Sequence, residues 1–376
     1  MGSTVQVHPQ HAALVELLAK QGLMSERWRE VWERIPRHLF IPPTIWRQGP
    51  GRCEPVTTEA EWWQLVYRDE PVVTQVDDGA TDGPGVATCS NSQPSMVATM
   101  LQHLDVQDGE KVLEIGTGTG YVGALLSERL GDEQVFSVEI DPPLAHQARE
   151  NLAALGYAPT VAVADGEHGY AEAAPYDRLI ATCALRRVPY ELVRQVKSGG
   201  MLVAPLAREF WSGAVVQLSV REGRASGPFR GGASYMPMRS HRAPEGPPVD
   251  GTARATDTTV DPRRLLTIGF SIYAGARMPG VSMVHAEHDG TTEVWLIDQA
   301  GSGAFAEAGE QAWQYGERDL WRDVEETYQE YEALGLPEAD EFGLTVSARG
   351  QEVWLTHPGR VIDPRRVIAS AQRSRP

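Results

Sequence analysis

A strand, a glycine-rich turn and a helix follow one another in the middle of this chain. The apolar run Val112 to Ile115 leads into Gly116-Thr117-Gly118-Thr119-Gly120, and a helical pattern begins at Tyr121. Glycine lets the backbone approach a ligand where a Cβ atom would clash. The start of a helix offers unpaired N–H groups and the positive end of the helix dipole to a polar ligand. The segment therefore predicts an α/β fold with a ligand site at the carboxyl end of a strand.

Two later strand ends carry carboxylates. The strand Val135 to Glu139 ends in an acid, and Asp165-Gly166 follow a further strand. A carboxylate at the tip of the neighbouring parallel strand is placed to accept both hydroxyls of a ribose. These positions predict a nucleoside-binding site. The glycine turn taken alone is also compatible with a purely structural tight turn, although this is the less favoured interpretation.

The spacing of the glycines decides between nucleoside cofactors. The dinucleotide fingerprint Gly-x-Gly-x-x-Gly is not matched, because the third glycine comes one residue early. The pattern Glu-x-Gly-x-Gly-x-Gly, followed by an acidic strand end, resembles the S-adenosylmethionine (AdoMet) loop of class I methyltransferases. The resemblance implies a Rossmann-like doubly wound sheet with AdoMet as cofactor. The residues that it implies as binding groups are Glu114, Gly116, Thr117, Gly118, Gly120, Glu139 and Ile140.

Hydrophobic periodicity and turn signals predict the elements around this core. Residues 10–45 show helical spacing, residues 53–90 are expected to be irregular, and a helix starts at Pro94. Strand and helix then alternate through residue 206, as a doubly wound sheet requires. Antiparallel edge strands are expected at Val215 to Val220 and at Ser234 to Met238.

A change of composition to Pro, Gly, Thr and Arg marks residues 241–262 as a linker. It separates a catalytic domain (1–240, with the AdoMet core at about 94–206) from an accessory α+β domain (263–376). Within the accessory domain the pattern predicts strands at Leu265 to Ala274 and Glu293 to Ile297, a helix from Leu320 to Leu334, and a closing hairpin of Phe342 to Val346 and Glu352 to Thr356.

Composition narrows the classes of partner. The net charge of -17 disfavours nucleic acid, because binding to phosphates needs a basic face. Cys53, Cys89 and Cys183 lack the spacing of metal ligands, so we expect no metal site and a reducing, cytoplasmic environment. No run approaches 18 apolar residues and the N-terminus lacks a signal segment, so we expect no membrane partner. The oligomeric state stays open.

Several further blocks resemble protein-L-isoaspartate O-methyltransferases, in that family's order. They are Ile35 to Pro42, Tyr67 to Val73, Ser92 to Ala98, Glu139 to Pro142, Asp165-Gly166, Tyr176 to Arg178 and Lys197 to Gly200. The resemblance covers the N-terminal two-thirds of the chain. It implies transfer of a methyl group from AdoMet to a carboxylate of a protein or peptide.

The same resemblance implies roles for individual residues. Ser92 would be the active-site serine beside the transferable methyl group, and Asp165 with Gly166 would hold the adenine. The acceptor would contact Val73, Thr74, Asn91, Ser92, Thr182, Cys183 and Ala184. Structural alternatives stand beside three of these roles: Ser92 as the N-cap of the helix at Pro94, Asp165 as a turn residue, and Cys183 as a packing residue.

Such chemistry needs few special groups. An aspartyl carboxylate, with a pKa of about 3.9, is ionised at neutral pH, so no general base is required. A water-poor cleft raises the free energy of the separated sulfonium and carboxylate ions more than that of the transition state, in which both charges decrease. The work of the protein is therefore alignment of the two reactants.

Three features depart from the repair enzymes of that family. The segment from Thr74 to Ser92 is enlarged, Ser95 stands where those enzymes usually carry an aromatic residue or His, and a domain is added after residue 240. These departures resemble a branch associated with ribosomally made peptides, such as graspetides and, more loosely, lanthipeptides. Our hypothesis is methylation of an aspartyl side chain in a macrocyclised precursor peptide, followed by ring closure to an aspartimide.

Three alternatives remain: general repair of isoaspartate, methylation of a small-molecule carboxylate, and a silent peptide-binding partner with an AdoMet fold. The intact glycine turn, Glu139 and Ser92 argue against the silent partner.

Overall fold

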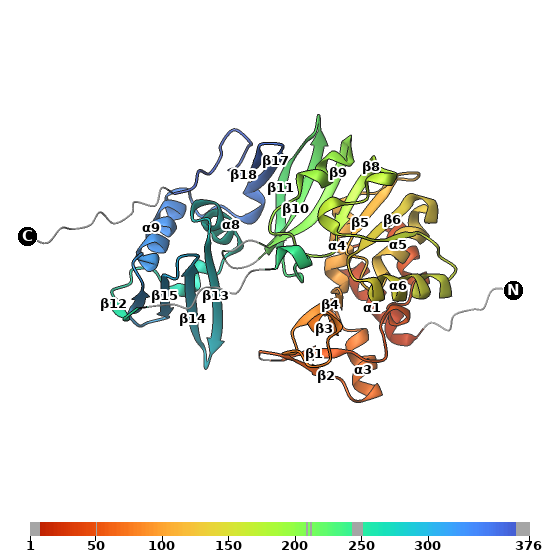
Figure 1. Cartoon of the computed structure of the whole chain (residues 1–376), viewed down its shortest axis with the longest axis horizontal. Helices are drawn as coiled ribbons and strands as arrows, with labels where there is room; N and C mark the ends of the chain where they lie inside the picture. The colour runs from red at the N-terminus through yellow and green to blue at the C-terminus, as the bar shows by residue number, and fades with distance from the viewer. Residues whose placement is uncertain (1–7, 50, 208–209, 211–212, 243–250, 366–376) are drawn as a thin grey trace, which may run out of the picture.

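The computed structural model describes residues 8–49, 51–207, 210, 213–242 and 251–365. A mixed sheet of nine strands forms its centre, in the order β18-β17-β11-β10-β9-β8-β5-β6-β7 (Figure 1). In this view a four-stranded sheet lies below it and a five-stranded sheet lies at the lower left. Short 3-10 helices are η1 (Arg37–Phe40), η2 (Asp77–Gly79), η3 (Asp132–Gln134), η4 (Gly166–His168), η5 (Ala171–Ala173), η6 (Arg239–His241), η7 (Pro262–Leu265) and η8 (Ala339–Glu341).

The parallel half of the central sheet contains the glycine turn. Its strands are β5 (Val112–Ile115), β6 (Val135–Glu139), β7 (Thr160–Val163) and β8 (Tyr176–Ala181), connected through helices α5 (Tyr121–Leu130) and α6 (Pro142–Ala154) and preceded by α4 (Pro94–Leu104). Side chains of β5 enter two cores alternately: Val112 enters one, and Leu113 and Ile115 enter the other. A strand buried on both faces is typical of a covered parallel sheet. This arrangement confirms the predicted doubly wound fold.

The other half of the sheet is mainly antiparallel. Helix α7 (Tyr190–Arg194) leads into β9 (Val196–Ala207), which is followed by β10 (Gly213–Arg221) and β11 (Arg224–Ala233). The predicted strand Val215 to Val220 lies in β10, but in the interior of the sheet and not at its edge. The predicted strand Ser234 to Met238 is wrong: Pro237 forms only an isolated bridge with Ala184. Proline has no N–H to donate to a strand ladder.

A small cap precedes this core. It contains α1 (Pro9–Lys20), α2 (Glu26–Arg34) and α3 (Glu59–Val66), and a sheet of β1 (Trp46–Gln48), β2 (Cys53–Pro55), β3 (Val72–Val76) and β4 (Ala87–Asn91) in the order β2-β1-β3-β4. The expectation that residues 53–90 are irregular was therefore wrong. Val72 and Val73 are both buried in β3, and the turn-rich residues lie only in the β3–β4 connection.

The C-terminal region forms a second α+β layer. Its sheet contains β12 (Arg254–Thr256), β13 (Val281–His288), β14 (Thr291–Asp298), β15 (Gly303–Glu307) and β16 (Ala312–Tyr315), with helices α8 (Ile268–Arg277) and α9 (Leu320–Ala333). The predicted strand Leu265 to Ala274 is wrong, because the Thr267 hydroxyl caps a helix by accepting from Phe270 N at 3.2 Å. Among the described residues, every helix falls short of the length and apolarity that a bilayer span requires.

The expected domain boundaries stay a prediction, and two strand pairings cross them. The expected linker 241–262 includes residues 243–250, which lie outside the described residues, and β12, which pairs with β16. The closing hairpin forms as β17 (Phe342–Ser347) and β18 (Gly350–Leu355), and β17 pairs with β11 of the central sheet. Phe210 packs edge-on against Phe270 at 5.6 Å, which joins the cores of the two layers.

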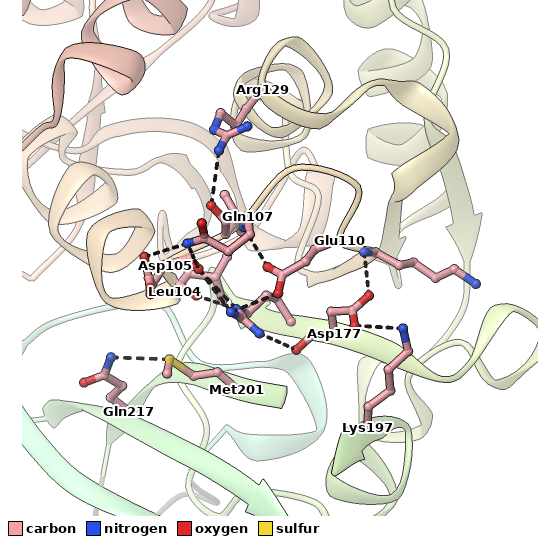
Figure 2. A network of polar contacts seen from close by, with 12 residues as sticks. Leu104, Asp105, Gln107, Glu110, Arg129, Asp177, Lys197, Met201 and Gln217 are labelled. Atoms are coloured by element: carbon pink, nitrogen blue, oxygen red, sulfur yellow. Dashed lines mark hydrogen bonds and ion pairs between the residues drawn. The ribbon is translucent and has the colours of Figure 1, made fainter. Parts of the chain in front are cut away.

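A polar network closes the amino ends of β5 and β8 (Figure 2). The Arg178 guanidinium contacts Glu110 at 3.0 Å and donates to Leu104 O at 2.9 Å. Asp177 accepts from Lys111 N at 2.9 Å and from Lys197 Nζ at 2.7 Å. These contacts anchor the loops at the amino edge of the sheet, opposite to the glycine turn.

Candidate active site

The glycine turn lies at the carboxyl end of β5. Gly116, Gly118 and Gly120 have φ values of +98°, +54° and +90°, in the region that favours glycine. A Cβ atom on Gly116 would lie 3.2 Å from Thr182 Oγ1, inside the space that the turn encloses. Gly120 is the N-cap of α5, so the turn delivers the backbone directly to a helix start.

Glu139 ends β6 beside this turn. Its Oε2 accepts from Gly118 N at 2.8 Å, and its Oε1 accepts from Asp141 N at 3.1 Å. Burial raises the pKa of Glu139, and these backbone hydrogen bonds oppose the rise by favouring the ionised form. The carboxylate is therefore held in one orientation at the wall of a cavity, next to Ile140.

Glu114 is completely buried within β5. The Ser137 hydroxyl donates to its Oε2 at 2.7 Å, and Ser137 also contacts Thr117 Oγ1 at 2.6 Å. Burial raises the pKa of Glu114 to about 8. Its Oε1 has no hydrogen-bond partner among the described residues, and the side chain borders a small cavity that Thr117 also lines. A buried, unpaired carboxyl oxygen favours a hydrogen-bond-donating ligand here.

Asp165 and Gly166 follow β7. Asp165 Oδ1 accepts from Glu167 N at 3.0 Å and so caps η4, which is the turn role considered above. Gly166 lines the same cavity as Glu139, and a Cβ atom there would lie 2.5 Å from Ile115 Cγ2. The structure thus brings the backbone at Gly166, and not the Asp165 side chain, to the cavity wall.

Two cavities meet in front of the glycine turn. The loop cavity is lined by Gly116, Gly118, Glu139, Ile140, Gly166 and Met238, among others, and has a volume of about 100 Å³. The outer cavity, of about 670 Å³, is lined by residues of the cap sheet together with Ser92 and Gln93. Ser90, Tyr235 and Met236 line both cavities. The segment Ser234 to Met238, which was wrongly predicted to be a strand, therefore forms a wall shared by the two cavities.

Ser92 lines the outer cavity, and its alternative role as an N-cap is wrong. The cap position belongs to Gln93, whose side chain makes no capping hydrogen bond. Asp69 Oδ1 instead accepts from Ser95 N at 2.8 Å at the start of α4. Burial raises the pKa of Tyr235, and the nearby Ser92 hydroxyl opposes that rise. The Ser92 hydroxyl is thus available at the junction of the cavities.

Sequence analysis missed Arg37, which supports the backbone at Ser92. The side chain is fully buried, and burial lowers its pKa to about 10. It donates to Ser92 O at 2.9 Å, to Asn91 O at 3.0 Å and to Asn91 Oδ1 at 2.7 Å. Asn91 Nδ2 in turn donates to Thr119 Oγ1 at 3.2 Å in the glycine turn. The only signal in the sequence was membership of the block Ile35 to Pro42.

The other expected acceptor contacts are arranged differently. Thr182 and Cys183 line the loop cavity and not the outer one, and burial raises the pKa of the Cys183 thiol to about 12, which fits a packing role. Ala184 is buried; its N donates to Met236 O at 2.8 Å and its O accepts from Met238 N at 2.9 Å. Val73 and Thr74 are buried in β3 and line neither cavity, whereas the next residue, Gln75, lines the loop cavity.

A group of four charged side chains, which we call the strap, crosses one side of the loop cavity. Arg242 contacts both oxygens of Asp78 at 2.5 and 2.7 Å. Arg239 reaches Asp78 at 2.9 Å and Asp141 at 3.0 Å. The Arg242 guanidinium lowers the pKa of the Asp78 carboxyl. The strap joins the β3–β4 connection to the segment after β11, and sequence analysis did not predict it.

These features define a class I AdoMet-dependent methyltransferase. The sheet order, the glycine turn after β5 and the acidic end of β6 all belong to that fold. The family model described as "Protein-L-isoaspartate(D-aspartate) O-methyltransferase (PCMT)" matches residues 9–242. The chain therefore belongs to this family of AdoMet-dependent carboxyl methyltransferases, as the sequence predicted.

One curated relative supports this assignment, and solved structures resemble the fold alone. A protein-L-isoaspartate O-methyltransferase of Methanoculleus marisnigri is 37% identical over 220 residues, which cover 58% of this chain and 86% of that protein. A solved structure named protein-L-isoaspartate O-methyltransferase covers 92% of this chain and 100% of its own, with a TM-score of 0.54 and 20% identity. Another, from Plasmodium falciparum and in complex with S-adenosyl-L-homocysteine, covers 62% and 99%, with a TM-score of 0.49 and 15% identity.

Proposed function

We propose that this enzyme transfers a methyl group from AdoMet to the free carboxylate of an isoaspartyl residue in a protein or peptide. The observation that carries the proposal is the junction of the two cavities, where Ser90, Tyr235 and Met236 form a common wall. A family match over residues 9–242 supports the same acceptor class. The three free thiols, Cys53, Cys89 and Cys183, support a reducing, cytoplasmic location.

The residues around the loop cavity fit AdoMet. Gly116 and Gly166 leave space that a side chain would fill, and the Glu139 carboxylate faces that space with a fixed orientation. The unpaired Glu114 Oε1, in the small cavity beside the glycine turn, can accept a hydrogen bond from such a ligand. When bound, AdoMet supplies an electrophilic methyl group. A volume of about 100 Å³ is below the roughly 300–1,000 Å³ of small-molecule sites, so we expect side chains at the cavity wall, such as Arg239 and Arg242 of the strap, to move when the cofactor enters.

The chain's own groups position the acceptor. Because a carboxylate is ionised at neutral pH, no side chain has to remove a proton. The Ser92 hydroxyl can donate to one oxygen of the acceptor and so orient the other. Burial keeps the Tyr235 hydroxyl protonated, so it offers a second neutral donor at the junction. Arg37 holds the backbone at residues 91 and 92 in place for both contacts.

A second candidate acceptor is an aspartyl side chain of a macrocyclised ribosomal peptide, with aspartimide as the outcome. The observation that favours it is the contribution of the enlarged segment, through Gly85, Val86 and Ala87, to the wall of the outer cavity. The accessory layer does not favour it, because a solved structure named protein-L-isoaspartate O-methyltransferase spans 92% of this chain.

Mass spectrometry with matched peptides tests the choice. One peptide carries isoaspartate, a second carries aspartate at the same position, and a third is the aspartyl peptide closed into a macrocycle. We expect a gain of one methyl group on the isoaspartyl peptide alone. Methylation confined to the macrocycle, followed by loss of methanol, would favour the second candidate and contradict the first.

A further inference from the structure

Arg52 is the one ionised side chain among the described residues that line the outer cavity. The other lining side chains are small, apolar or neutral and polar, and no carboxylate is among them. The whole chain carries a net charge of -17, so a wall of this composition is unusual for its surface. A guanidinium in such a wall attracts a carboxylate of the ligand.

The backbone of Arg52 is fixed on both sides. Gly49 N donates to Arg52 O at 3.0 Å, and Cys53 N donates to Gly85 O at 2.7 Å. A Cβ atom on Gly85 would lie 3.3 Å from Arg52 Cβ, so the two segments pack closely. The turn between β1 and β2 thus holds Arg52 against the β3–β4 connection at the rim of the outer cavity.

Carboxylates near Arg52 are already engaged elsewhere. Glu54 pairs with Arg47 at 3.0 Å. Both oxygens of Asp77 accept backbone hydrogen bonds, from Gly85 N and Val86 N at 2.8 Å each. No hydrogen bond or ion pair of the Arg52 side chain is found within residues 8–49, 51–207, 210, 213–242 and 251–365. The Arg52 guanidinium is therefore not paired with any side chain of these described residues.

We propose that Arg52 selects acceptors that carry a second carboxylate close to the methylated one. This inference rests on the proposed function, because it assumes that the acceptor peptide occupies the outer cavity. The Arg52 guanidinium pairs with an acidic side chain, or with a free C-terminal carboxylate, a few residues from the acceptor. The acceptor carboxylate itself lies at the junction, beside Ser92 and Tyr235.

Steady-state kinetics with paired peptides test the proposal. Each pair has Glu or Gln at one of the three positions on either side of the acceptor, and both an isoaspartyl and an aspartyl series are made. For the wild-type enzyme we expect at least one Glu peptide to exceed its Gln partner by about threefold to fivefold in kcat/KM, the scale of an exposed ion pair. Arg52→Gln should remove this preference, and Arg52→Glu should reverse it, while the Gln peptides are methylated as before.

Arg68→Gln is the matched control, because Arg68 is an exposed arginine that pairs with Glu70 and does not line the outer cavity, and its replacement leaves the pair of Arg47 and Glu54 intact. It should keep the preference for Glu. An equal loss on Glu and Gln peptides in Arg52→Gln would overturn the proposal, since Arg52 would then serve the acceptor carboxylate or the fold. So would the absence of any Glu preference in the wild type. Activity confined to the aspartyl series would contradict the proposed function. The preference for Glu over Gln peptides could still be measured within that series.

Discussion

The two edges of the central sheet treat polar groups in opposite ways. At the amino edge, Arg178 pairs with Glu110, and Asp177 pairs with Lys197 (Figure 2). At the carboxyl edge, Glu114 Oε1, the Tyr235 hydroxyl and Arg239 Nε are buried and lack partners among the described residues. Leaving a buried polar group unpaired costs about 1–3 kcal/mol. The comparison indicates that the ion pairs of Asp177 and Arg178 stabilise the amino edge, whereas unpaired groups at the carboxyl edge are available to ligands.

The largest effect is expected at Glu139. Replacing it with alanine removes the acceptor for Gly118 N and the carboxylate that faces the loop cavity. Glu139→Ala should therefore weaken AdoMet binding by about 1–3 kcal/mol, the cost of leaving ribose hydroxyls unpaired. Isothermal titration calorimetry with S-adenosylhomocysteine measures this change.

Glu110→Ala is the matching change at the amino edge. It breaks the contact with Arg178 at 3.0 Å, so it should lower the melting temperature and leave cofactor affinity unchanged. If the two variants weakened the cofactor equally, the distinction between the edges would be wrong.

Ser92→Ala comes next in size. Loss of a hydroxyl that orients the acceptor should lower kcat about tenfold, in line with one hydrogen bond. The KM for AdoMet should change less than kcat, because Ser92 lines the outer cavity and only the edge of the cofactor region, at the small cavity beside Glu114, and does not line the loop cavity. Ser95→Ala is the control, since its side chain contacts only Gln93 among the described residues and its backbone contact with Asp69 remains. A collapse of AdoMet binding in Ser92→Ala would mean that the serine is structural.

Local spacing was enough to find one part of this site. The glycines and Glu139 were predictable because each follows a strand directly, and parallel strands end at a common edge. Arg37 was not predictable in the same way, because its role depends on Asn91, 54 positions away. The strap was not predictable for the same reason, because Asp78 and Arg242 are 164 positions apart in the sequence.

Two errors in secondary structure have different physical causes. The run Leu265 to Ala274 was assigned to a strand because a short apolar run has no decisive period, whereas the Thr267 cap and burial of Phe270 favour a helix. The cap sheet was missed because Gly, Pro and Asp in residues 77–85 suggested an irregular segment. They form only the connection between two short strands.

The strap gives a smaller and pH-dependent effect. Asp78→Asn removes the charge that pairs with Arg239 and Arg242, so S-adenosylhomocysteine should dissociate about threefold faster, as for an exposed ion pair. Asp82→Asn, in the same connection but at a carboxylate that pairs with neither Arg239 nor Arg242, should have no effect. Stopped-flow dissociation measures both.

The sign of the pH effect follows from the lowered pKa of Asp78, which Arg242 causes. The Asp78 carboxylate stays ionised even at the pH where an ordinary aspartate becomes protonated. The ion pair with Arg242 is lost only when the pH falls through this lowered pKa. The difference in dissociation rate between the wild type and Asp78→Asn should therefore be constant from neutral pH down to about pH 4 and disappear below it. Changes shared by both enzymes report other groups, such as Glu139, whose pKa burial raises. A difference that disappears near neutral pH would contradict control by Asp78.

The smallest effect is expected from Lys197→Ala at the amino edge. Lys197 Nζ lies 2.7 Å from Asp177, but the lysine side chain is 46% exposed, so water screens the pair. The free energy of unfolding should fall by less than about 1 kcal/mol, as measured by urea denaturation. Asp177 keeps its hydrogen bond from Lys111 N at 2.9 Å, which explains why the loss is small.

The kcat and the KM for AdoMet of Lys197→Ala should match those of the wild type, because the amino edge contributes no side chain to either cavity. A loss of turnover without a loss of stability would show that the two edges are coupled, and the contrast between them would then fail.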